Sequence, residues 1–133
     1  MNTQGSQGSA KVLIVEDELL VRMFAVDTLE EAGFEVAQAG DGAEALEALR
    51  ASQTGFAAVI IDLGLPDRSG EQLAAEIRAM HASLPIVIAS GRSERELRDS
   101  FADDQHIAIL VKPYTSTLLL ASLESLGVSS GGE

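Results

Sequence analysis

The chain has 133 residues, of which 9 are basic and 21 acidic, giving a formal net charge of −12 at neutral pH. This length fits one domain with a core of its own, and the acidic balance disfavours nucleic-acid binding, which requires clustered lysines and arginines. Cysteine is absent, which excludes disulfides, thiolate metal sites and a cysteine nucleophile. Because no apolar run is long enough for a membrane span or signal peptide, we expect a cytoplasmic domain.

The first predicted element is a buried strand. Residues 12–15 are apolar throughout, as in strands that are covered on both faces of a parallel sheet. A helix follows, because apolar side chains then recur at helical spacing up to Gly33, which ends the pattern. The predicted core face of this helix consists of Val21, Phe24, Ala25, Thr28, Leu29 and Ala32.

The remaining elements continue this alternation. Residues 35–39 alternate polar and apolar side chains and predict an edge strand, whereas 57–61, 86–89 and 107–111 predict buried strands. The helical patterns are carried by Ala45, Leu46 and Leu49, by Leu73, Ile77 and Met80, by Leu97 and Phe101, and by Leu118, Leu119, Ser122, Leu123 and Leu126. This order predicts an α/β domain with a five-stranded open parallel sheet. We expect the domain to span 11–127, with flexible tails at 1–10 and 128–133.

Polar side chains follow four of the predicted strands. Glu16 and Asp17 come after the first, Asp62 after the third, Ser90 after the fourth and Lys112 after the fifth. The carboxyl ends of parallel strands share one edge of the sheet, where ligands bind in such folds. Carboxylates gathered there repel one another unless a hard cation such as Mg²⁺ compensates. A metal beside an acceptor aspartate, a hydroxyl and a lysine fits phosphoryl transfer.

Four motifs resemble the receiver domain of two-component response regulators. They lie at residues 11–18, at 61–66 together with Gly70, at 90–91 and at 112–114, and the likeness runs over about 11–127. The resemblance implies a flavodoxin-like sheet in the order 2-1-3-4-5 with helices on both faces. The periodicity of the sequence independently indicates the same fold class.

The resemblance also implies a metal site built around the phosphoacceptor. Asp62 would accept the phosphoryl group and also belong to the metal site, in which Asp17 would bind Mg²⁺ directly. Glu16 would act beside Asp17, and Gly64 would supply its main-chain carbonyl as a further ligand, for which a side chain is not required.

Two further residues would contact the phosphoryl group. The resemblance implies that Ser90 hydrogen-bonds one phosphoryl oxygen and that Lys112 pairs with another. The Lys112–Pro113 bond resembles the cis peptide of the family, which proline makes accessible. Ile109 departs from the pattern, because many receivers carry Tyr or Phe there, turning inward when the Ser or Thr engages the phosphoryl group. This substitution puts the usual aromatic readout in question.

The expected partner is a sensor histidine kinase or a histidine phosphotransfer protein. In receivers, the first helix and the loop after the fifth strand dock the histidine-bearing helical bundle. At 100° per residue, Met23 lies opposite the predicted core face and Leu20 near its margin. We therefore predict a docking patch of Leu20, Met23, Pro113 and Tyr114. Direct binding to nucleic acid or membrane is not expected, and a phosphorylation-dependent homodimer stays open.

Other segments are given simpler interpretations. Residues 67–70 are read as a turn and helix cap, and 103–106 form an unusually polar loop where receivers commonly have small residues. His81 and His106 are not expected to share a metal or catalytic role. Arg92 is interpreted as a solvated side chain.

The favoured function is phosphorelay signalling, with the chain acting as a single-domain response regulator, a relay intermediate or a phosphate sink. It would catalyse at most its own phosphorylation and dephosphorylation. The alternative is a phosphorylation-independent interaction module, which Ile109 favours. A flavodoxin-like cofactor site is disfavoured because the acidic residues 16–18 would repel an unneutralised phosphate. Whether the chain belongs to a longer hybrid protein is left open.

Overall fold

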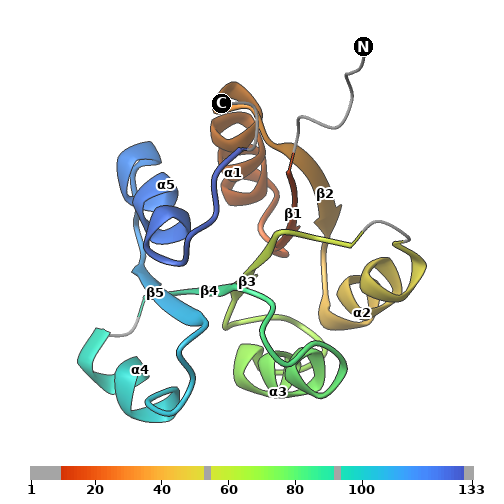
Figure 1. Ribbon diagram of the computed structural model, residues 1–133, viewed down its shortest axis with the longest axis vertical. Coiled ribbons are helices and arrows are strands. Elements are labelled where there is room, and N and C mark those ends of the chain that lie inside the picture. Colours follow the sequence, from red (N-terminus) through yellow and green to blue (C-terminus); the bar gives the residue numbers. More distant parts are fainter. Residues whose placement is uncertain (1–9, 53–54, 92–93, 131–133) are drawn as a thin grey trace.

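The computed structural model describes residues 10–52, 55–91 and 94–130. Within these ranges, strands and helices alternate from one end to the other (Figure 1). They are β1 (Lys11–Val15), α1 (Leu19–Glu31), β2 (Glu35–Ala39), α2 (Gly42–Ala51), β3 (Ala58–Asp62), α3 (Gly70–Met80), β4 (Ile86–Ser90), α4 (Glu94–Ser100), β5 (Ile107–Val111) and α5 (Ser116–Ser125). The strands form one parallel sheet in the order β2-β1-β3-β4-β5, which confirms the predicted flavodoxin-like fold.

The sheet is buried between two helical layers. Helices α1 and α5 lie on one side of it, and α2, α3 and α4 on the other (Figure 1). Along β1, Val12 and Ile14 belong to the core beneath α1 and α5, whereas Leu13 and Val15 belong to the opposite core. Because successive side chains of a strand point to opposite faces, burial on both sides explains why β1, β3 and β4 are apolar throughout.

The two edges of the sheet differ in their protection. At β2, the side chains of Glu35 and Gln38 are exposed, as the alternating pattern predicts for an edge strand. At β5, the covering helix α4 has only seven residues, and Leu97 is its fully buried side chain among those described. The predicted helical pattern here consists of only two apolar residues, Leu97 and Phe101, and the helix is correspondingly short.

One part of the predicted core face of α1 is wrong. Phe24 is 41% exposed, and Val26 is buried instead, at 9%. The side of α1 that carries Phe24 faces the loop after β5, where its ring lies 6.0 Å from that of Tyr114. Met80 and Leu118, which also belong to helical apolar patterns, are likewise exposed, at 38% and 51%.

The two described ends of the chain meet at the amino edge of the sheet. The Ala10 amide donates a hydrogen bond of 2.9 Å to the Ser130 carbonyl, and Val128 is buried against the core beneath α1 and α5. The mobility of the two predicted tails stays a prediction. Among the described residues, every helix is too short or too polar to cross a bilayer.

Candidate functional site

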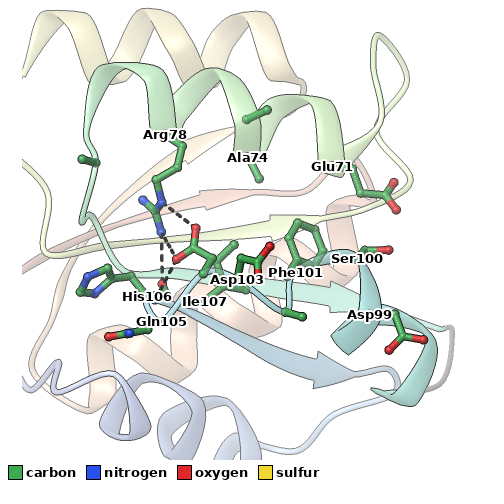
Figure 2. Close-up of a pocket in the computed structure, with 14 residues that line it drawn as sticks. Glu71, Ala74, Arg78, Asp99, Ser100, Phe101, Asp103, Gln105, His106 and Ile107 are labelled. Carbon is green, nitrogen blue, oxygen red and sulfur yellow. Dashed lines mark hydrogen bonds and ion pairs between the residues drawn. The ribbon is translucent and has the colours of Figure 1, made fainter.

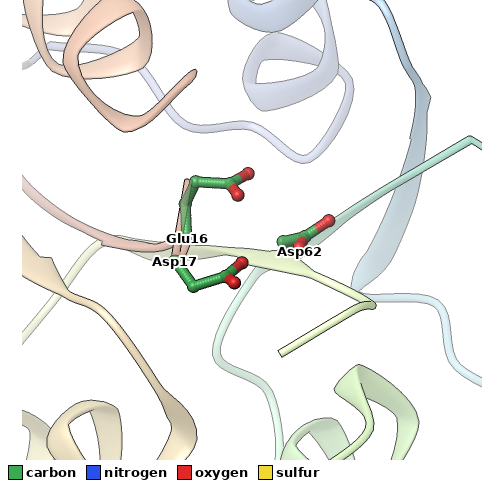
Figure 3. A group of neighbouring side chains, drawn as sticks. All are labelled: Glu16, Asp17 and Asp62. Atoms are coloured by element: carbon green, nitrogen blue, oxygen red, sulfur yellow. The ribbon is translucent and has the colours of Figure 1, made fainter. Parts of the chain in front are cut away.

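Three carboxylates meet at the carboxyl edge of the sheet. Val15 of β1 pairs with Ile61 of β3, so the residues that follow them, Glu16 and Asp62, emerge side by side. Asp17 joins them (Figure 3), and one ligand oxygen from each of the three side chains lies within 4.8 Å of the others. Glu16 and Asp62 are buried and Asp17 is exposed, so the cluster opens to solvent on the side of Asp17.

Lys112 holds the two buried carboxylates together. Its Nζ atom donates to Asp62 Oδ1 at 2.8 Å and to Glu16 Oε1 at 3.1 Å. The second oxygen of Glu16 accepts a hydrogen bond of 3.1 Å from the Glu18 amide. Buried charges are tolerated when they are paired and hydrogen-bonded in this way.

The pKa values of this cluster follow from its burial. Desolvation raises the pKa of Glu16 above its ordinary value, and the negative charge of Asp62 acts in the same direction, against the hydrogen bonds from the Glu18 amide and Lys112. For Lys112, burial lowers the pKa, but the hydrogen bonds to Asp62 and Glu16 outweigh burial, and the pKa is raised. Lys112 is therefore charged at neutral pH.

The donor set fits a hard divalent cation. Mg²⁺ prefers a few carboxylate oxygens and keeps several waters, and the cluster offers carboxylates from Glu16, Asp17 and Asp62, one of them open to solvent. Gly64 lies close by, because a Cβ atom at this position would be 3.7 Å from Asp62 Oδ2. That the Gly64 carbonyl is a ligand of the metal stays a prediction.

Ser90 and the loop after β5 complete the edge of the site. Ser90 is buried at the end of β4, and its carbonyl accepts a hydrogen bond of 2.8 Å from the Lys112 amide. The Lys112–Pro113 peptide bond is cis, as the resemblance implied. The hydrogen bond of Ser90 to a phosphoryl oxygen stays a prediction, and Arg92 lies outside the described residues.

A family model for the response regulator receiver domain matches residues 12–124 of this chain. The chain belongs to the receiver domain family. Receivers are signalling modules of two-component systems, rather than enzymes in the usual sense, and they bind Mg²⁺ at an acidic pocket.

The most similar proteins include regulators and a kinase. The transcriptional regulatory protein PdtaR of Mycobacterium tuberculosis is 38% identical over 115 residues, covering 86% of this chain and 55% of its own. The sensor kinase CckA of Brucella abortus is 32% identical over 119 residues, covering 90% of this chain and 13% of its own. The solved structure of the chemotaxis protein CheY4 of Vibrio cholerae has a TM-score of 0.81 and 29% identity, covering 89% of this chain and 98% of that chain. The chain thus spans about half the length of the first curated relatives that it matches.

An apolar hollow of this receiver lies next to the acidic pocket. It has a volume of about 390 Å³ and lies between α1 and the loop after β5; its lining includes Leu20, Phe24, Pro113 and Tyr114 together with Lys112. Leu20 is 79% exposed, whereas Tyr114 is partly buried, and this burial raises the pKa of its hydroxyl. Leu20, Pro113 and Tyr114 all line the hollow. The structure therefore brings together three of the four residues predicted for a docking patch.

The fourth of these residues, Met23, does not line the hollow. Its side chain is 49% exposed on α1, outside the lining of the hollow. Phe24, which the sequence pattern assigned to the core, lines the hollow instead, with its ring 6.0 Å from that of Tyr114. Whether this surface docks a partner stays a prediction.

The polar loop at 103–106 of the receiver has a structural explanation. Figure 2 shows Arg78 reaching from α3 into a hollow of about 620 Å³ beside this loop. Arg78 donates from Nε to Asp104 Oδ2 at 2.8 Å and from Nη2 to Asp104 Oδ1 at 3.2 Å. It also binds the main-chain carbonyls of His81, Leu84 and His106. The histidines take part through their backbones, and none of the predicted site residues lines this hollow.

Ile109 of the receiver packs against the core beneath α2, α3 and α4 and is partly buried. An aliphatic side chain in this place fills space without offering a ring or hydroxyl for a conformational readout.

The sequence analysis did not predict the contacts of two residues, Arg22 and Asp67, that hold the segments around the acidic pocket of the receiver in place. Arg22 donates from Nη1 to the Glu16 carbonyl at 2.8 Å. Asp67 accepts hydrogen bonds from the amides of Gly42 and Ala43 in α2. The helix cap predicted at 67–70 is confirmed, because the Ser69 hydroxyl accepts a hydrogen bond from the Gln72 amide at the start of α3. No local pattern marks the role of Asp67, because its partners lie about 25 residues away along the chain.

Proposed function

We propose that this receiver accepts a phosphoryl group from a phosphohistidine onto Asp62. The observation that carries the proposal is the position of Lys112 Nζ, 2.8 Å from Asp62 Oδ1, beside three carboxylates that fit Mg²⁺. In the transfer, an Asp62 carboxylate oxygen forms a bond to phosphorus while the bond from phosphorus to the imidazole nitrogen breaks. The electron pair of that bond stays on the leaving histidine.

Each neighbour of Asp62 has a defined part in this step. Glu16, Asp17, Asp62 itself and the Gly64 carbonyl would hold Mg²⁺, which supplies positive charge for the phosphoryl oxygens. Lys112, already charged and held at Asp62, would shift to a phosphoryl oxygen and neutralise it. The Ser90 hydroxyl would donate to another phosphoryl oxygen from the end of β4.

The partner would approach over the hollow beside α1. Leu20, Met23, Pro113 and Tyr114 would form the contact surface for the helical bundle of a sensor kinase or phosphotransfer protein. Support comes from the exposure of Leu20 and Met23 and from the lining of the hollow, which includes Lys112. In this arrangement a histidine on the partner could reach Asp62 from the solvent-open side. Acting alone in the cell, the chain would serve as a response regulator, a relay intermediate or a phosphate sink.

The decisive experiment is intact-mass spectrometry after incubation with acetyl phosphate and Mg²⁺. We expect one phosphoryl adduct in the wild type and in Asp27→Asn, a control variant at an exposed position on α1. We expect no adduct in Asp62→Asn or after chelation of the metal. An adduct that persists in Asp62→Asn would disprove the assignment of the acceptor.

Ile109 favours a second candidate function, a phosphorylation-independent interaction module. Its aliphatic side chain packs against the core at the position where an aromatic side chain would report phosphorylation. Hydrogen exchange of β5 and α4 with and without the adduct separates the two functions. Slower or faster exchange upon phosphorylation supports a switch, whereas identical exchange supports the module.

A further inference from the structure

Asp67 lies in the loop that follows Asp62, yet its carboxylate binds a different part of the receiver. Oδ1 accepts a hydrogen bond of 2.8 Å from the Gly42 amide, and Oδ2 accepts one of 3.0 Å from the Ala43 amide. These are the first amides of α2, and the next one, at Glu44, is bound by Asp41 at 2.8 Å. Helix α2 is therefore capped by two aspartates, one from its own turn and one from the loop between β3 and α3.

The end of β2, which leads directly into the turn before α2, is attached to the loop that carries Glu16 and Asp17. The Ala39 carbonyl accepts a hydrogen bond of 3.0 Å from the Glu16 amide. Arg22 of α1 bridges the same two segments, because it donates to the Glu16 carbonyl at 2.8 Å and to Gln38 Oε1 at 3.1 Å. The segment from the end of β2 to the start of α2 is therefore bound at one end by the loop of Glu16 and at the other by Asp67.

The loop between β3 and α3 is closed at its base as well as held at its tip. At the base, the Gly70 amide donates to the Leu63 carbonyl at 3.0 Å, and a Cβ atom at Gly70 would lie only 2.7 Å from the Leu63 Cα. At the tip, Arg68 covers the backbone of Gly42, where a Cβ atom would lie 2.6 Å from its Cδ. Gly64 lies between these two anchors.

We infer that Asp67 is a positioning residue for the metal site. By binding the amides of Gly42 and Ala43, it fixes the loop of Gly64 to the start of α2, three residues after the end of β2 that holds the Glu16 amide, and so sets the spacing between the two sets of ligands. The inference rests on the proposed function, since it concerns the ligands of the same cation. It predicts that Asp67 affects Mg²⁺ affinity without touching the ion.

The test compares two aspartates that cap the same helix. Asp67→Ala and Asp41→Ala each remove side-chain hydrogen bonds from the first turn of α2, but Asp67 alone belongs to the metal-binding loop. Mg²⁺ binding to the full chain is measured by isothermal titration calorimetry, with the metal as the probe, and thermal unfolding is measured without metal. We expect both variants to lose stability and Asp67→Ala alone to bind Mg²⁺ about 10-fold more weakly, the scale seen for outer-shell partners of metal ligands.

Asp67→Asn serves as the conservative variant, because its amide oxygen can accept one of the two hydrogen bonds. We expect its dissociation constant for Mg²⁺ to lie between those of the wild type and Asp67→Ala. Equal Mg²⁺ affinity in Asp67→Ala and Asp41→Ala would overturn the inference and reduce Asp67 to a helix cap. Absence of Mg²⁺ binding by the wild type would instead overturn the proposed metal site, and the inference with it.

Discussion

Lys112 reaches Asp62 across an intervening strand. Its Nζ atom lies 2.8 Å from Asp62 Oδ1, although β5 and β3 are separated in the sheet by β4. The same ammonium binds Glu16 at the end of β1. The Lys112 ammonium thus links the ends of β1, β3 and β5, and it partly neutralises the buried carboxylates of Glu16 and Asp62.

We predict that Lys112→Met destabilises the metal-free protein. The substitution leaves Glu16 and Asp62 buried without their cation, which costs about 1–3 kcal/mol in the free energy of unfolding. Urea unfolding measures the loss, and added Mg²⁺ should recover part of it because it binds only the folded state. The other lysine of the chain, Lys11, lies over the ring of Phe56, and Lys11→Met should be close to wild type. Equal losses in the two variants would contradict the prediction.

The ion pair of Arg78 and Asp104 should make stability depend on pH in acid. The hydrogen bond from Arg78 holds the pKa of Asp104 below its ordinary value of 3.8. A lowered pKa contributes stability above pH 3.8 and loses it as the pH falls through the pKa of the folded state.

Asp104→Asn should therefore be less stable than the wild type by about 1 kcal/mol at pH 7. The difference should shrink below pH 3.8 as Asp104 of the wild type takes up its proton. Urea unfolding from pH 7 to pH 3 measures this, with Asp103→Asn, at an exposed neighbouring position, as the control. A difference that stays constant down to pH 3 would rule out the ion pair as its cause.

We predict that the double substitution Leu20→Glu and Met23→Glu slows phosphotransfer from a phosphohistidine partner at least about tenfold, a loss of about 1.4 kcal/mol in the transition state. Acidic side chains on the exposed face of α1 would lose favourable hydration if a helical bundle covered them, which weakens docking of the partner. The substitutions leave Asp62 itself unchanged. Phosphorylation by acetyl phosphate should therefore be unchanged. Met80→Glu, on the exposed end of α3, is the matched control. Unchanged phosphotransfer kinetics in the double variant would remove α1 from the docking surface.

Leu97 should be the main apolar anchor of helix α4 among the described residues. Leu97 is fully buried in a helix of seven residues, so Leu97→Ala should lower the free energy of unfolding by about 2–4 kcal/mol. Leu118→Ala, which truncates a leucine that is 51% exposed on α5, should cost little. Chemical denaturation of both variants measures the contrast, and similar losses would show that burial in the structure does not govern the energetics here.

The sequence predicted the sheet and the residues of its carboxyl edge well, for a physical reason. Strands buried on both faces are apolar without interruption, so the first polar residue after each run marks where the strand leaves the core. Glu16, Asp62 and Lys112 are identified in this way, and the parallel order of the strands brings them together.

The contacts between distant segments could not be predicted from local patterns. Asp67 reads as a turn residue, and the amides that it binds belong to a helix that precedes it in the chain. Asp104 looks like one more acidic residue in a polar loop until α3 places Arg78 beside it. Phe24 was assigned to the core because its spacing fits the helix, whereas its ring turns toward Tyr114, a neighbour that the helical period does not encode.

The hydrogen bond between Ala10 and Ser130 has a practical consequence. The chain enters and leaves the described domain at neighbouring points at the amino edge of the sheet, whereas Asp62 lies at the opposite edge. Strands of five residues separate the two edges by about 16 Å. A fluorescent protein or a second domain joined at either point would therefore stand away from the acidic pocket. Joining the two points by a short linker and opening the chain elsewhere would likewise give a circular permutant with an unobstructed pocket.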